Sequence, residues 1–317
     1  IGSAQGSDGQ VLTSTGSGVG WEDASGGASD IDGLSDCLVE NNSMWLGNDP
    51  SGTTDTASYC IGIGATALDA ITTGDHNVAI GYGAMDAVTE GYQSVGIGYN
   101  ALTAMTTNGQ NVAVGYSALS SVTGAYYGNV GIGHGAGSNI GSGSGNICIG
   151  NEALCGNAYW NVVIGPSAGH SANTGGENVF VGVHAGTVAT SGDQNVFVGG
   201  YAGAANTTGE NNTAIGYQTM DAATTGTHNT ALGNHSMGSG VITGVGNCAV
   251  SYAALVNLTS GTYNVGVGAY AGAYLTSGDN NIIIGYEAGM SGSPGGEIST
   301  ADNEICLGDE NISAANI

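Results

Sequence analysis

Carboxylates and histidines are the side chains in this sequence with the most chemistry to offer. The chain carries 25 Asp and Glu residues and 6 His residues but no Lys or Arg. Asp193 and Glu210 lie 17 residues apart, each just before a recurring Asn, and carboxylate and carbonyl oxygens are the ligands that Ca²⁺ prefers. These two residues are therefore the calcium candidates. Solvated turn acids are the simpler interpretation, since neighbouring repeat units carry Gly or Thr at that place.

The histidines do not form a cluster of the kind that binds a metal ion. They occupy scattered places in the chain and are expected to be surface residues: His76, His134, His170, His184, His228 and His235. The acids occur singly in turns, whereas glycoside hydrolysis needs two carboxylates facing one another. We therefore expect no enzyme, and no cofactor apart from the calcium candidates.

The absence of cationic side chains excludes whole classes of partner. A net charge of −25 offers nothing that would attract nucleic acid or anionic lipid. The carboxylates repel one another unless salt screens them, which favours an extracellular or virion-surface setting over a cytosol. No apolar run is long enough to span a bilayer, so we expect no membrane insertion.

The cysteines have no CxxC spacing that would suggest a metal or redox motif. In an oxidising compartment Cys37 with Cys60, and Cys148 with Cys155, are candidate disulfides. The alternative is that they are small buried hydrophobic residues.

A five-residue word recurs along the chain and positions all of these groups. It reads NVAIG at 77–81, SVGIG at 94–98, NVAVG at 111–115 and NIIIG at 281–285, and almost every step is 17 residues. Such a period is typical of a stacked repeat array. We predict an all-β fold, a parallel β-solenoid of about sixteen 17-residue coils.

Equivalent positions in successive coils should stack about 4.8 Å apart and form columns. The aliphatic residues three and one before the final Gly of the word, such as Val78 and Ile80, are expected to point into the coil. An Asn column four before that Gly is expected to form a structural ladder between coils. It includes Asn77, Asn111, Asn129, Asn178, Asn195 and Asn281.

The column two before the same Gly is never polar. Since it lies on the other strand face, it should be polar if that face met water. We therefore expect it to pack against another copy of the chain and to be the oligomer interface. The residues predicted to form this interface are Ala79, Ala113, Val163, Phe180, Phe197, Ala214, Ala231 and Ile283.

The ends of the chain do not follow the repeat. Residues 1–40 are expected to form a short hairpin-like module with a Ser- and Gly-rich linker. Residues 41–290 are the predicted solenoid, and residues 291–317 form an imperfect last coil with a C-terminal joining segment.

Some of these words resemble known families. NVVIGPSAGHSA at 161–172 is similar to the head repeats of trimeric autotransporter adhesins. NTAIGYQTMDAATTGTHNTALG at 212–233, GQVLTSTGSGVGW at 9–21 and the ending ADNEICLGDENISAANI resemble tailed-bacteriophage tail fibres matured by a self-cleaving chaperone. The resemblance implies a homotrimer that attaches to a host surface, and it supplies no catalytic residues.

Two functions remain open at this point. One is a non-enzymatic virion-surface or extracellular fibre, with a structural shaft and an adhesive role toward a cell-surface receptor or glycan. The alternative is a self-assembling extracellular filament subunit, glycosylated at sequons such as Asn257 and joined end to end through its termini.

Overall fold

The computed structural model describes residues 10–14, 19–23, 37–47, 53, 55–124, 128–171, 174–294, 296–309 and 311. Strands β1 (Gln10–Ser14) and β2 (Val19–Asp23) pair antiparallel as a hairpin, inside the predicted N-terminal module. The linker expected after this hairpin, up to residue 36, and the end of the joining segment, residues 312–317, lie outside the described residues.

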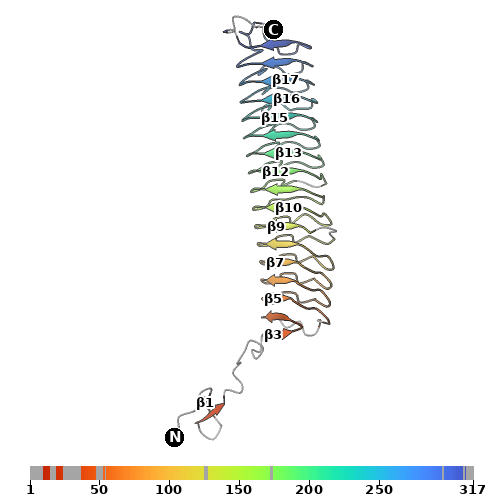
Figure 1. Ribbon diagram of the computed structural model, residues 1–317, viewed down its shortest axis with the longest axis vertical. Coiled ribbons are helices and arrows are strands. Elements are labelled where there is room, and N and C mark those ends of the chain that lie inside the picture. Colours follow the sequence, from red (N-terminus) through yellow and green to blue (C-terminus); the bar gives the residue numbers. More distant parts are fainter. Residues whose placement is uncertain are drawn as a thin grey trace.

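The remaining strands form one parallel β-solenoid, as the 17-residue period predicts. Figure 1 shows the coils stacked in one direction, with one strand in each. Strands β4 to β19 each pair in parallel with the next, and Val78, Val95 and Val112 are in register on β6, β7 and β8. The bounds are β3 (Cys37–Glu40), β4 (Ser43–Leu46), β5 (Ile61–Ile63), β6 (Val78–Ile80), β7 (Val95–Ile97), β8 (Val112–Val114), β9 (Val130–Ile132), β10 (Ile147–Ile149), β11 (Val162–Ile164), β12 (Val179–Val181), β13 (Val196–Val198), β14 (Thr213–Ile215), β15 (Thr230–Leu232), β16 (Cys248–Val250), β17 (Val265–Val267), β18 (Ile282–Ile284) and β19 (Ile305–Leu307).

Strand β3 ends the parallel ladder on its N-terminal side. It pairs antiparallel with β4, through a tight turn in which Asn41 and Asn42 have φ values of 49° and 59°. Asn tolerates this left-handed conformation better than most residues, which favours a two-residue hairpin turn. The first coil is therefore covered by a strand that runs against all the others.

The glycine that closes the repeated word, with Ser251 as its exception among the described coils, lets the coils stack closely. At Gly81 the backbone has φ +128°, and a Cβ atom there would lie 2.7 Å from the carbonyl oxygen of Gly98 in the next coil. A side chain at this column would thus meet the backbone of the following coil. The repeated Gly lets successive coils approach to strand spacing.

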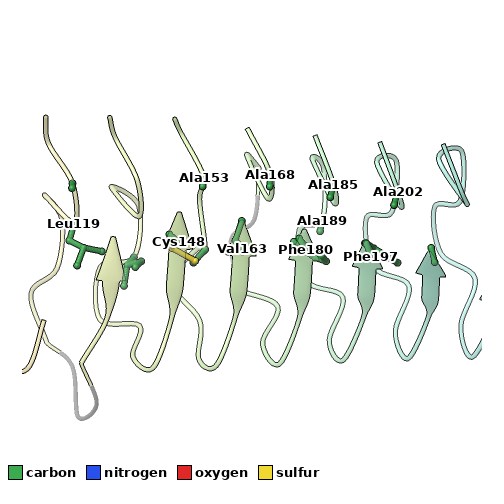
Figure 2. Close-up of a cluster of buried hydrophobic side chains, with 14 of the residues drawn as sticks. Leu119, Cys148, Ala153, Val163, Ala168, Phe180, Ala185, Ala189, Phe197 and Ala202 are labelled. Atoms are coloured by element: carbon green, nitrogen blue, oxygen red, sulfur yellow. A yellow bond between two sulfur atoms is a disulfide. The ribbon is translucent and has the colours of Figure 1, made fainter. Parts of the chain in front are cut away.

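The interior of the coil is lined by different residues from those that the sequence predicts. The middle residue of each strand points inward and is buried, whereas the first and third, such as Val78 and Ile80, are half-buried on the outside. The expectation that the aliphatic pair fills the coil is therefore wrong. Figure 2 shows Val163, Phe180 and Phe197 in a row along the strands, with Ala168, Ala185 and Ala202 in a row along a facing segment.

The predicted oligomer interface is wrong for the same reason. The column proposed for it faces the interior of its own coil, and its members are at most 1 % exposed in a single chain. These residues are Ala79, Ala113, Val163, Phe180, Phe197, Ala214, Ala231 and Ile283.

Large and small residues compensate one another inside each coil. Phe180 and Phe197 stack with ring centroids 5.3 Å apart, and they lie against Gly186 and Gly203 on the facing segment. Where the strand carries Gly instead, the space is taken by a long side chain: a Cβ on Gly96 would lie 2.8 Å from Cγ of Met85. The coil interior thus holds a nearly constant volume, as close packing demands.

One disulfide crosses this interior. Cys148 and Cys155 are bonded, with their Cα atoms 6.1 Å apart, so one of the two candidate pairs is present. The other is absent, because Cys60 is a free, buried thiol. The side chain of Cys37 lies outside the described residues.

The buried Asn residues join the coils as a ladder. The Nδ2 of Asn195 donates to the carbonyl oxygen of Gly209 at 2.9 Å, and its Oδ1 accepts from the backbone N–H of Asn212 at 3.0 Å. The same donor bond recurs at Asn77, Asn129, Asn178 and Asn281, with Gly91, Gly143, Gly192 and Ala301 as acceptors. Asn111 lies in the ladder too: its Oδ1 accepts from the N–H of Asn129 at 2.9 Å, while its Nδ2 donates to Gly109 in its own coil.

A threonine column forms a second ladder at the outer turn. The Oγ1 of Thr190 donates to the carbonyl oxygen of Thr207 at 3.0 Å, and Thr207 donates in turn to Thr224 at 3.0 Å. These hydroxyl groups therefore hold one coil to the next.

Replacing Asn195 by Ala should lower the free energy of unfolding by about 1 to 3 kcal/mol, because it leaves the Asn212 N–H buried without a partner and removes one of the two side-chain donors to the Gly209 carbonyl, the other being Asn206. Chemical denaturation followed by circular dichroism measures the change. Thr208→Ala, an exposed position in the adjacent turn, is the control and should leave the transition unchanged. Equal transitions for Asn195→Ala and the control would show that the ladder is dispensable.

Candidate interaction surfaces

The outer sheet face is the most extensive apolar surface of the solenoid. We define it as the first and third residues of strands β5 to β19, which point away from the coil interior. Apart from Thr213, Thr230 and Cys248 these residues are all Val, Ile or Leu, and none is charged. Ile132, Ile215 and Ile284 are 39 to 42 % exposed. A chain with 25 acidic residues thus keeps one whole face free of charge.

The size of this face is that of a protein interface. At about 4.8 Å per coil the strands β5 to β19 span roughly 67 Å, and a three-residue strand is about 10 Å wide. The outer sheet face therefore has a footprint of roughly 700 Å². Monomeric proteins seldom expose a contiguous apolar patch above roughly 600 Å², whereas a standard interface buries about 800 Å² on each partner.

Aromatic rings from successive coils stack beside one another and form what we call the aromatic ladder. One part contains Tyr82, Tyr99, Tyr116 and His134, with ring centroids 5.0 to 5.4 Å apart. The other part runs from His184 through Tyr201, Tyr217, His235 and Tyr252 to Tyr270, mostly edge to face. Six of these tyrosines are 40 to 56 % exposed, namely Tyr82, Tyr99, Tyr116, Tyr201, Tyr217 and Tyr252. Their rings therefore offer contact area to a partner.

Sequence reasoning missed this ladder because the histidines seemed scattered. Three histidines, His134, His184 and His235, follow the repeated Gly by one or two residues, as most tyrosines of the ladder do. They therefore lie on the same side of the coil as those tyrosines. Grouping Tyr and His as one aromatic class, counted from the repeated Gly, would have found the ladder.

The calcium candidates Asp193 and Glu210 lie on adjacent coils, as expected, and line one recess. Within the described part of the chain, no group of three or more His, Cys, Asp or Glu residues is placed to hold a metal ion. The Oδ1 of Asp193 accepts a hydrogen bond from the backbone N–H of Gly176 at 2.7 Å. Asp193 therefore already stabilises a turn.

The buried thiol of Cys60 is unsuited to nucleophilic chemistry. Burial raises its pKa, and the nearby negative charge of Asp75 raises it further, although hydrogen bonds from Asn77 and His76 act in the opposite direction. Since the thiolate is the reactive form, this thiol is inert at neutral pH. Its Sγ donates to the carbonyl oxygens of Ser58 at 3.5 Å and Gly74 at 3.4 Å.

Asp221 is a carboxylate in an unusually apolar place. It lines a cavity of about 310 Å³ together with His184, Val188 and Tyr201, and its Oδ1 is buried with no hydrogen-bond partner among the described residues. Burial raises the pKa of Asp221, and His235 partly offsets the effect. The charged form is thus destabilised where it lies.

Comparison with protein families, with curated proteins and with solved structures finds no match to this chain. In the described ranges no helix is long and apolar enough to cross a membrane. The class of the molecule is therefore given by its fold, a parallel β-solenoid repeat protein.

Replacing Asp221 by Asn should stabilise the fold at pH 7 by about 1 kcal/mol, because it removes a charge that is poorly solvated. The folded-state pKa is raised above that of the unfolded chain, so the penalty is absent below the unfolded value of 3.8 and grows as pH rises through the folded value. Thermal melts at pH 3 and pH 7 measure it.

Asp69→Asn is the matched control, since Asp69 occupies the equivalent repeat position but is exposed. A gain at pH 7 that persists unchanged at pH 3 would contradict the electrostatic explanation.

Proposed function

We propose that this chain is a non-enzymatic structural protein, the rigid shaft of an extracellular or virion-surface fibre, whose copies associate side by side through the outer sheet face. The observation that carries the proposal is the uncharged, aliphatic character of that face along the whole solenoid. Burial of apolar surface contributes about 25 cal/mol per Å². A face of this size therefore supplies a strong driving force for assembly.

Electrostatics supports assembly through this face. Each copy carries a net charge of −25 and no cation, so two copies repel wherever their acids approach. Contact is favourable only where acids are absent and salt screens those at the rim. The outer sheet face meets this requirement.

The number of copies in the assembly is proposed from the family resemblance, which implies a homotrimer. Three solenoids arranged around a common axis would each turn the outer sheet face inward. In this arrangement the outer sheet face is the interface. The column expected from the sequence cannot serve, because its residues are buried in the chain's own core.

The antiparallel strand β3 supports a rod of fixed length over an end-to-end filament. A filament that grew by strand pairing would have to continue the parallel ladder, and at its N-terminal side β3 turns back along β4. The aromatic ladder supports the adhesive role, because its exposed rings offer stacking area to a receptor or glycan.

Replacing Ile215 by Glu should shift the protein from oligomer to monomer while its melting temperature as a monomer changes little. Ile215 is 42 % exposed on β14, so the chain tolerates a carboxylate there, but three such charges would meet at the assembly axis. Sedimentation velocity at 0.15 M and 0.5 M NaCl measures the mass.

Thr225→Glu adds the same charge to an exposed turn of the same coil and should leave the mass unchanged. Ala231→Glu, by contrast, places a carboxylate inside the coil and should unfold that region. A wild-type mass equal to one chain at both salt concentrations would overturn the proposed assembly.

A further inference from the structure

A recess between aromatic and acidic side chains lies in the turns that precede strands β11 to β14. It has a volume of about 410 Å³ and is lined by Tyr159, Trp160, Thr174, Gly176, Glu177, Asp193, Gln194 and Glu210. Tyr159 and Trp160 are 50 % and 49 % exposed, which is unusual for such large rings. The recess lies outside the first and third strand positions that define the outer sheet face.

Backbone hydrogen bonds fix the order of the coils around this recess. The N–H of Glu177 donates to the carbonyl oxygen of Tyr159 at 3.0 Å, and the N–H of Gln194 donates to that of Gly176 at 3.1 Å. The next bond joins the N–H of Asn211 to the carbonyl oxygen of Asp193 at 3.1 Å. The aromatic rings therefore lie on one coil and the acids on the three coils that follow.

Gly176 leaves the space that the recess occupies. It stands between Tyr159 and Asp193 in the column of stacked positions and has no side chain to fill the gap. A Cβ atom there would lie 3.0 Å from the carbonyl oxygen of Tyr159. Trp160 is also held in place, because its ring lies against Gly145 of the preceding coil, where a Cβ atom would be 2.6 Å from the indole.

Hydrogen bonds position two of the three acids, Glu177 and Asp193. Glu177 accepts a hydrogen bond from Nε2 of Gln194 at 2.8 Å, and Asp193 accepts one from the N–H of Gly176. The chain contains no Lys or Arg that would neutralise them. Three carboxylates therefore face a small recess whose other wall is formed by two aromatic rings.

Both walls favour a positive charge. The face of an indole or phenol ring attracts a cation, most strongly for Trp, and carboxylates add direct Coulomb attraction. A bare metal ion is a poorer match than an organic cation, since two large apolar rings offer it no oxygen ligands. We infer that this recess binds an organic cation, an alkylammonium or guanidinium group, with the ring of Trp160 as its platform and Glu177, Asp193 and Glu210 as its counter-charges.

This inference deepens the proposed adhesive role by naming the chemistry of the group that is bound. It does not depend on lateral assembly, because the residues that bind the cation are separate from Ile215 and the rest of the outer sheet face. Failure of one proposal therefore leaves the other standing.

Titration of the full chain with choline and with arginine methyl ester, at constant ionic strength, tests the inference through tryptophan emission, to which Trp21 and Trp45 also contribute; Trp160→Phe should abolish the part of the change that comes from the recess. Wild type should show a saturable change. The variant Asp193→Asn/Glu210→Gln should bind both probes about tenfold more weakly, because each amide keeps the shape and the acceptor oxygen but loses the charge. Trp160→Phe, followed by calorimetry, should weaken binding as well.

Asp279→Asn is the matched control. Asp279 occupies the equivalent turn position and accepts from the N–H of Thr262 at 2.7 Å, but it does not line the recess. The affinity of the Asp279→Asn variant for both probes should equal that of wild type. Circular dichroism melts of all variants establish that the solenoid is intact.

Two results would overturn the inference. The first is undiminished binding of the probes by Asp193→Asn/Glu210→Gln, which would place the cation elsewhere. The second is saturable binding of methyl α-glucoside or of Ca²⁺ with no response to choline or arginine methyl ester, which would make the recess a sugar or metal site.

Discussion

The narrow interior of each coil is the constraint on which the rest of the structure depends. The coil has room for one inward residue from the strand and a short row of residues from the facing segment, so a large group on one side requires a small one on the other. Phe180 with Gly186, and Met85 with Gly96, are the two extremes of this exchange. Because the interior is filled by the middle residue of the strand, the aliphatic residues on either side must lie outside.

This constraint explains why a chain so rich in acids carries a charge-free face. The Val and Ile residues on the outside of the strands suit the pleated backbone, yet they leave apolar surface in contact with water. Single exposed aliphatic residues are ordinary in soluble proteins, but a band of them from β5 to β19, with Thr213, Thr230 and Cys248 as its exceptions, is not. The proposed fibre would bury that band between copies, and the polar ladders of Asn and Thr join the coils beneath it.

The stacking that aligns the core also creates surface features from residues far apart in the chain. A departure from the repeat in one coil becomes a local surface feature, because the coils above and below keep their register. Gly176 between Tyr159 and Asp193 opens a recess in this way, and His134 continues a stack of tyrosines because it follows the repeated Gly as they do.

The sequence by itself determined the class of fold, the coil length and register and the Asn ladder, since each follows from a period. The pairing of a large residue, Phe197, with a small one, Gly203, is also present in the sequence. Only the tertiary structure decided which strand face is inside. Alternation along a strand shows that two faces differ but not which one meets the core, and here both are apolar, so the choice depends on the volume enclosed by the coil.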